Sequence, residues 1–225
     1  MLAVLYDIHG NLRALEAVLA EAERVRPHGY LLGGDYGTPS PAPRETLDRL
    51  RELENATWIR GNGERWLRDP PQDRPEVVEA YNVFVPGSLP QDELDWLYSL
   101  PEQAELDGVL YVHGCVGRDD DSFAREPQPE DEWRIGDEHD RPIVFGHSHL
   151  QFRRPGPRGT DLLNPGSVGM PLDGDRRAAW AVRRDDGEFE FRRTEYDVER
   201  AVAAWRRLGG TFGEAVATRL ERGFD

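Results

Sequence analysis

The chain has 225 residues, 38% of them hydrophobic, and its 43 acidic side chains against 28 basic ones, all arginine, give a formal net charge of −15. This length and composition suit a globular protein with a sizeable core and exclude a disordered chain. The acidic surface argues against non-specific binding to nucleic-acid backbones, but it leaves a small phosphate substrate open if metal ions reverse the local field.

A βαβ unit is predicted at the start of the chain. Leu2–Tyr6 is a short apolar run, typical of a buried parallel strand. From Leu12 onward apolar residues recur at helical spacing, and Asn11 is placed to cap that helix. The next strand is expected at Tyr30–Leu32. Such units place ligand sites at the carboxyl ends of their strands.

Strands and helices continue to alternate along the rest of the chain, apart from a proline-rich loop at 36–43. Helices are expected at 45–53, 77–85, 90–100, 130–135, 198–208 and 212–222. Strands are expected at 57–60, 109–112, 143–145, 160–163, 178–183 and 188–196. Hairpin turns are expected at Asp107-Gly108 and Asp185-Asp186-Gly187. This pattern indicates an α/β protein.

No internal repeat and no linker divides the chain, so we expect a single domain over residues 1–225. Cys115 is the only cysteine, which excludes an intrachain disulfide and favours a reducing compartment. The start of the chain lacks the basic region of a signal peptide, and no apolar run approaches the length of a membrane span. We therefore expect a cytoplasmic protein with no membrane partner.

Polar clusters follow five of the short apolar runs. They are Asp7-Ile8-His9, Gly34-Asp35, Gly61-Asn62, His113-Gly114 and Gly146-His147-Ser148-His149. One such cluster alone is weak, since Gly-Asp is a common turn and a histidine after a strand is more often structural than a ligand. Their repetition favours a shared site, because strand ends converge in an α/β sheet.

The two histidines of the last cluster are the strongest single signal. In an extended segment His147 and His149 would point to the same side, and imidazole is the commonest protein ligand of metals. The alternative is a polar turn that carries two surface histidines. Together the clusters supply seven candidate ligands, too many for one tetrahedral zinc, so two divalent ions ~3.5–4 Å apart fit better. The candidates are Asp7, His9, Asp35, Asn62, His113, His147 and His149.

In this order, the clusters Asp-x-His, Gly-Asp, Gly-Asn, His-Gly and Gly-His-x-His resemble the calcineurin-like metallophosphoesterase superfamily. The opening Asp-Ile-His-Gly-Asn-Leu-x-Ala-Leu and the later Asn-Pro-Gly-Ser-Val-Gly resemble its small prokaryotic phosphodiesterase branch. The resemblance spans roughly residues 2–170. It implies a four-layer α/β/β/α sandwich of two mixed β-sheets flanked by helices.

The resemblance also implies a set of ligands for two divalent ions. Asp7, His9 and His149 would hold one ion, Asn62, His113 and His147 would hold the other, and Asp35 would bridge them. Asp35, Asn62 and His113 are the implied catalytic residues. The ions would be Mn, Fe, Ni or Zn, since ligand types alone do not choose among these metals. The implied reaction is hydrolysis of a phosphoester by in-line attack of a metal-bridging hydroxide.

One position departs from the family pattern. Many relatives carry histidine directly after the Gly-Asn pair, where this chain has Gly63. We expect the change to weaken catalysis for poor leaving groups and to favour aryl or strained diesters. His139 is a distant candidate to replace the missing imidazole, although a surface histidine is the preferred interpretation.

Several other residues receive a structural interpretation first. Glu64 is expected to favour a helix start and Cys115 to fill the core. Asn164 and Ser167 are candidates to support the metal ligands. Arg60 and Arg118 are candidates to contact a phosphate, and Trp66 is a candidate to line the cleft. Gly166 and Gly169 are expected to allow tight backbone turns.

We interpret the chain as a metal-dependent phosphoesterase, with a phosphodiesterase favoured. The alternatives are a phosphomonoesterase or dinucleoside-polyphosphate hydrolase on the same fold, and a non-catalytic metal-binding scaffold or sensor. A Rossmann-type nucleotide binder is disfavoured, because Gly34–Gly37 lacks the G-x-G-x-x-G spacing. The expected partner is a small phosphoester, and the sequence leaves the oligomeric state open.

Overall fold

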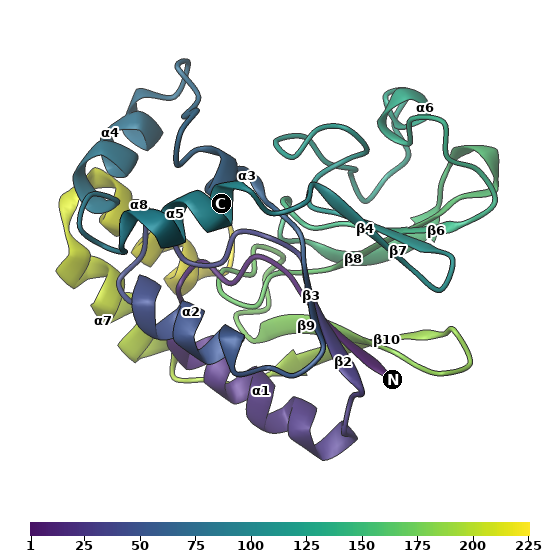
Figure 1. The fold of residues 1–225 in the computed structure, drawn as a ribbon, viewed down its shortest axis with the longest axis horizontal. Helices are drawn as coiled ribbons and strands as arrows, with labels where there is room; N and C mark the ends of the chain where they lie inside the picture. Colours follow the sequence, from purple (N-terminus) through teal and green to yellow (C-terminus); the bar gives the residue numbers. More distant parts are fainter.

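Two mixed β-sheets of five strands each form the centre of the molecule, in a computed structural model that describes residues 1–225 (Figure 1). The first sheet has the order β10-β9-β1-β2-β3 and the second the order β4-β5-β6-β8-β7. The first contains β1 (Leu2–Leu5), β2 (Gly29–Leu32), β3 (Ala56–Trp58), β9 (Ala178–Arg183) and β10 (Phe189–Thr194). The second contains β4 (Gln103–Leu106), β5 (Val109–Val112), β6 (Pro142–Val144), β7 (Gln151–Pro155) and β8 (Asp161–Pro165).

Helices flank the two sheets. They are α1 (Leu12–Val25), α2 (Pro43–Arg51), α3 (Asn62–Arg65), α4 (Pro75–Phe84), α5 (Gln91–Tyr98), α6 (Asp131–Arg134), α7 (Val198–Leu208) and α8 (Gly210–Arg222), with a short 3-10 turn, η1, at Pro157–Gly159. Figure 1 shows α1 and α2 beyond the first sheet and α6 beyond the second. The four-layer sandwich predicted from the sequence is confirmed.

The alternation of side chains along β1 explains how the layers hold together. Leu2 and Val4 pack in the core between the sheets, against residues of the second sheet such as Tyr111. Ala3 and Leu5 point the other way and pack with the apolar stripe of α1. Successive side chains of a strand face opposite sides, so a strand buried on both faces must be apolar throughout.

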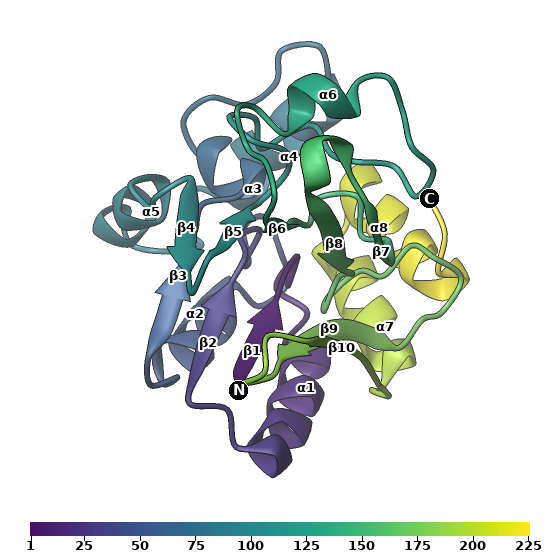
Figure 2. The same cartoon turned by 90° about the vertical axis from the view of Figure 1, so that its right-hand side faces the viewer.

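The strands that carry the polar clusters run in parallel. β1 pairs with β2, and β2 with β3, all in parallel (Figure 2). In the second sheet β5 pairs in parallel with β6, which does the same with β8. Their carboxyl ends therefore lie at one edge of each sheet. The predicted cap also forms, since the Asn11 side chain accepts from the Ala14 N–H at 3.2 Å.

Strand β7 and the turn η1 were not predicted, and helix α3 begins before the helix start that was expected near Glu64. β7 lies at the edge of the second sheet, and its sequence Gln-Phe-Arg-Arg-Pro has neither clear alternation nor a continuous apolar run. A strand that ends in proline is tolerated at an edge because a ladder donor is not needed there. Helix α3 is a single turn and contains Asn62, which the sequence placed simply after a strand.

None of the helices combines the length and the hydrophobicity that crossing a lipid bilayer requires.

Candidate metal centre

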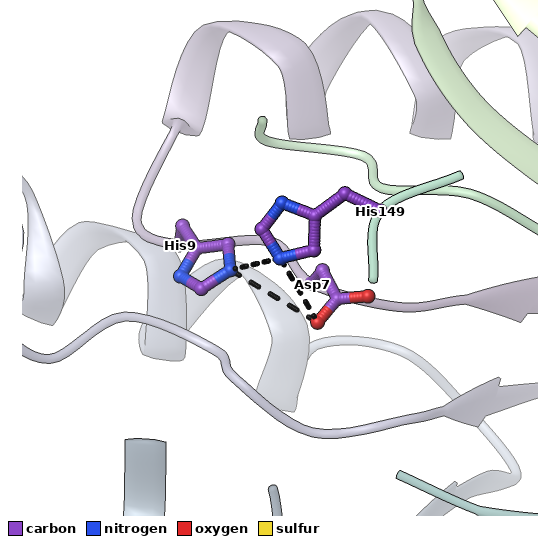
Figure 3. Close-up of side chains that lie close together, drawn as sticks. All are labelled: Asp7, His9 and His149. Carbon is purple, nitrogen blue, oxygen red and sulfur yellow. Dashed lines mark hydrogen bonds and ion pairs between the residues drawn. The ribbon is translucent and has the colours of Figure 1, made fainter. Parts of the chain in front are cut away.

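Three side chains from two distant parts of the chain converge on one point (Figure 3). The Nε2 atoms of His9 and His149 lie 3.0 Å apart. Oδ1 of Asp7 lies 3.5 Å from His149 Nε2 and 4.0 Å from His9 Nε2. Two imidazole nitrogens and a carboxylate oxygen this close form a donor set typical of a first-row divalent metal.

A second group adjoins the first through Asp7. Nε2 of His113 lies 3.7 Å from Asp7 Oδ1 and 3.6 Å from Asp35 Oδ1. Oδ1 of Asn62 lies 3.0 Å from His113 Nε2 and 2.7 Å from Nδ1 of His147. All seven side chains named from the sequence therefore meet in one place. Their division between two ions stays a prediction.

The two carboxylates occupy different positions in this cluster. Asp7 belongs to both three-residue groups, Asp7–His9–His149 and Asp7–Asp35–His113. Asp35 presents one oxygen to each side, since Oδ2 lies 3.8 Å from His9 Nε2 and Oδ1 faces His113. The family resemblance implied Asp35 as the shared carboxylate, and the central place of Asp7 was not foreseen.

The backbone at the cluster is left-handed at five ligand positions. The φ angles are 53° at Asp7, 48° at His9, 56° at Asp35, 65° at His147 and 58° at His149. His147 and His149 do meet in one site, but the predicted reason, an extended segment with alternating side chains, is wrong. β6 ends at Val144, and left-handed turns direct the two rings. Residues other than glycine adopt such angles rarely and at a cost.

Hydrogen bonds fix which nitrogen of two rings faces the cluster. Nδ1 of His113 lies 2.7 Å from the Gly33 carbonyl, and Nδ1 of His149 lies 2.8 Å from the Met170 carbonyl. A carbonyl only accepts, so each Nδ1 donates, and in the neutral ring Nε2 keeps its lone pair. These bonds orient the rings in the way that second partners orient metal-binding histidines.

The Asp7 carboxylate supplies the clearest sign that a cation fits. Its Oδ1 is buried and has no hydrogen-bond partner, although three imidazole nitrogens surround it. A buried carboxylate oxygen without a donor is costly, and such charges are normally paired or coordinate metals. The residues present therefore fit a divalent cation.

Burial keeps two of the imidazoles in their metal-binding form. Burial, with the nearby His149, lowers the pKa of His9 to about 3. Burial, with the nearby His113, lowers the pKa of His147 to about 4. Both rings are thus neutral at pH 7, and only neutral imidazole binds a metal.

The pKa values of His113, Asp35 and Asp7 show that the cluster favours a bound positive charge. Burial opposes charge on His113, but Asp35 and Asp7 outweigh it and raise its pKa to about 9. Burial is the main cause that raises the pKa of Asp35 to about 7. Burial also opposes charge on Asp7, yet the histidines around it hold its pKa well below the usual range. The cluster thus attracts positive charge, from a proton or from a metal ion.

Glu64 has a role that the sequence did not reveal. Its fully buried carboxylate accepts from the backbone N–H groups of Asp35, Tyr36 and Gly61, each at 2.9 Å. It lies in the first turn of α3, as interpreted, but its bonds tie the loop after β2 to the loop after β3. The only signal for this was its place two residues after Asn62.

Tyr81 also joins these loops, and the sequence missed it. Its hydroxyl lies 2.9 Å from the Gly63 carbonyl and 3.2 Å from the Thr38 carbonyl. Gly63 in turn donates its N–H to Asp35 Oδ1 at 2.6 Å. A Cβ at Gly63 would lie 2.8 Å from that same oxygen, so a histidine there would displace Asp35. Gly63→His is therefore not a clean test of the missing imidazole.

Asn164 and Ser167 support the backbone that carries the ligands. The Asn164 amide donates to the Gly146 carbonyl at 3.1 Å, and the Ser167 hydroxyl donates to the Asp7 carbonyl at 2.7 Å. Two glycines nearby are required for different reasons. Gly166 has a φ of 79°, and a Cβ on Gly169 would lie 1.8 Å from the Ile8 carbonyl oxygen.

The remaining candidates lie outside the cluster. Arg60 is bound to the Tyr98 carbonyl and to Glu102, and Arg118 lies 3.5 Å from Asp120. His139 is 71% exposed beside Asp140, which agrees with a surface histidine. Cys115 is buried, and burial raises its pKa to about 11, which agrees with an inert filler.

Fold and donor set together define a class of metal-binding α/β/β/α sandwich proteins. Residues 1–186 match the family model described as the calcineurin-like phosphoesterase superfamily domain. The chain therefore belongs to the calcineurin-like phosphoesterase superfamily, as the sequence motifs predicted. This is a family of phosphoesterases that use divalent metals.

Known proteins resemble the chain over nearly its full length. An uncharacterised protein of Methanocaldococcus jannaschii is 27% identical, over 89% of this chain and 90% of its own. The crystal structure of a metallophosphoesterase from Sphaerobacter thermophilus is 26% identical, covers 99% of both chains and superposes with a TM-score of 0.79. A hypothetical protein of Pyrococcus horikoshii, 21% identical over 99% of both chains, shares the fold with a TM-score of 0.77.

Metal removal should lower thermal stability. A metal that binds only the folded state adds about 2.7 kcal/mol when its concentration is about 100 times its Kd. For a chain of this size we expect Mn²⁺ to raise the Tm of chelator-treated protein by ~5–10 °C. Differential scanning fluorimetry would measure the shift. Asp7→Asn should abolish it, whereas the exposed Asp92→Asn should not, and an equal shift in both variants would contradict a site at Asp7.

Proposed function

We propose that the chain is a phosphodiesterase that depends on two divalent ions. Asp7, His9 and His149 would hold one ion, Asn62, His113 and His147 the other, and Asp35 would bridge them. The unpartnered Asp7 Oδ1 among three imidazole nitrogens is the observation that carries this proposal. The opposed oxygens of Asp35 support its bridging role. Mn, Fe, Ni and Zn all suit such ligands.

Two divalent ions, when bound, supply a nucleophile from water near neutral pH and neutralise charge on the phosphoryl oxygens. The chain's residues set the geometry for this chemistry. Asn62 offers a neutral amide oxygen, which keeps the centre from becoming too anionic. His113 is oriented by the Gly33 carbonyl, and Gly63 leaves the nearby Asp35 carboxylate in place.

Two features favour a diester over a monoester. A cavity of about 700 Å³ extends from the ligands, and this volume leaves space for both organic groups of a diester. Gly63 provides no side chain to protonate a poor leaving group, which suits aryl or strained diesters. The alternatives stay a phosphomonoesterase or dinucleoside-polyphosphate hydrolase, and a metal-binding scaffold without turnover.

We also propose that residues 1–225 form one domain in a reducing, cytoplasmic setting. Helices α7 and α8 lie beyond the matched residues 1–186, yet α7 contacts α1 and α8 contacts α4. These contacts support one folding unit. The single cysteine supports the reducing compartment.

Turnover of two chromogenic esters tests the proposed activity. With Mn²⁺ or Ni²⁺ we expect kcat/KM for bis-p-nitrophenyl phosphate to exceed that for p-nitrophenyl phosphate by about tenfold, or ~1.4 kcal/mol. A chelator should abolish both activities. A preference for the monoester would indicate a phosphatase, and no metal-dependent turnover of either ester would indicate a scaffold. Elemental analysis of the purified protein would count the ions.

A further inference from the structure

The cavity beside the ligands is much larger than the cluster itself. Its volume is about 700 Å³, and its lining includes His9, Asn62 and His147 at one end. The rest of the lining includes Trp66, just after α3, and several residues of α4 and α8. Pockets of this size enclose organic ligands rather than a single inorganic ion.

Two aromatic pairs line this cavity. Trp66 and Tyr81 form an edge-to-face pair with ring centroids 6.1 Å apart, and Trp205 and Phe212 form another at 6.0 Å. Apolar side chains such as Val77 and Val216 also line the cavity. Trp66, Tyr81 and Trp205 are buried, so Phe212, which stays partly exposed, is the ring of these four that can stack on a planar ligand.

The two arginines of the lining differ in their pairing. Arg219 forms an ion pair with Asp225 at 2.6 Å, whereas the exposed Arg74 pairs with no carboxylate. The Arg74 guanidinium lies 5.9 Å from the centroid of the Trp66 ring. It is therefore available both to a stacked ring and to an anionic group.

We propose that this cavity is a subsite for the organic group of the substrate and that it takes a planar, nucleobase-sized ring. The inference rests on the proposed function, because it assumes that the phosphoryl group lies at the metal ligands. Helix α8, which supplies Phe212, lies outside the matched residues 1–186. Part of the subsite thus lies beyond the residues that the family model covers, while Trp66, Tyr81 and Arg74 lie within them.

Equilibrium binding tests the subsite without turnover. Calorimetry on the Mn²⁺-loaded protein would compare AMP with ribose 5-phosphate, which carries a hydroxyl in place of the adenine ring, while phosphate release is monitored to confirm that both stay intact. Stacking predicts that AMP binds on the order of tenfold more tightly. Phe212→Leu keeps an apolar side chain but loses the ring, and it should remove most of this advantage with little change for ribose 5-phosphate.

Phe191→Leu is the matched control. Phe191 is 37% exposed on β10 and does not line the cavity, so its loss should leave the advantage of AMP intact. Equal affinity of the two ligands for the unaltered protein would overturn the subsite, and so would equal effects of the two substitutions. Failure of the proposed function would instead show as the absence of metal-dependent diester turnover, which this measurement does not use.

Discussion

Asp35→Asn is expected to lower kcat/KM for bis-p-nitrophenyl phosphate by on the order of 10³-fold, or about 4 kcal/mol of transition-state stabilisation. The carboxylate faces His9 with Oδ2 and His113 with Oδ1, at 3.8 and 3.6 Å. An amide can accept the Gly63 N–H bond with its single oxygen, but it then turns an NH₂ group toward His9. The variant should therefore lose metal as well as activity. Steady-state kinetics and elemental analysis would measure both.

The control for this substitution is Asp92→Asn. Asp92 is exposed in α5 and makes no ion pair, so its replacement should leave kinetics and metal content unchanged. Retention of both ions and full activity by the Asp35 variant would rule out a bridging carboxylate at this position. Loss of one ion with the other retained would assign Asp35 to a single site.

Glu64→Ala is expected to lower the free energy of unfolding by about 3 kcal/mol or more. The substitution leaves the N–H groups of Asp35, Tyr36 and Gly61 without an acceptor, and each unsatisfied buried group costs about 1–3 kcal/mol before any relaxation. A chain of this size would lose ~6–12 °C in Tm. Urea titration and scanning calorimetry would measure the loss.

Two further variants separate the causes of this effect. Glu64→Gln keeps the shape and one acceptor oxygen, so it should fall between the native protein and the alanine variant. Glu79→Ala removes an exposed carboxylate from α4 that makes no ion pair, and it should change stability by less than about 0.5 kcal/mol. A loss below about 1 kcal/mol for Glu64→Ala would show that water replaces the carboxylate at the three N–H groups.

The local pattern was sufficient to predict an α/β fold and the gathering of the ligands, whereas the four-layer sandwich was implied by the family resemblance. Short apolar runs marked β1, β2 and β5, and parallel strands bring their carboxyl ends together. Polar residues directly after those runs had to meet. This reasoning needs only local pattern and one topological rule, and for this reason it reached Asp7 and His113 without side-chain detail.

Other features depend on packing between distant segments and have no local signal. Glu64 and Tyr81 act through bonds to loops that precede them by many residues, and Phe212 reaches the cavity only because α8 packs near α4. β7 has an edge position that makes few demands on its sequence. Left-handed turns at His147 and His149 replace the expected extended segment. The local pattern of apolar and polar residues does not distinguish one from the other.

The left-handed backbone has a consequence for how far the centre can be redesigned. Among residues other than glycine, Asn, Asp and His are the types that adopt this conformation most readily, and they are also oxygen and nitrogen donors. At Asp7, His9, Asp35, His147 and His149 one residue type thus meets a chemical and a conformational demand together. Converting the centre to a softer, thiolate-rich ligand set for a different metal would require cysteine at angles it seldom adopts. The left-handed turns therefore restrict which metal-binding residue types can replace the present ones.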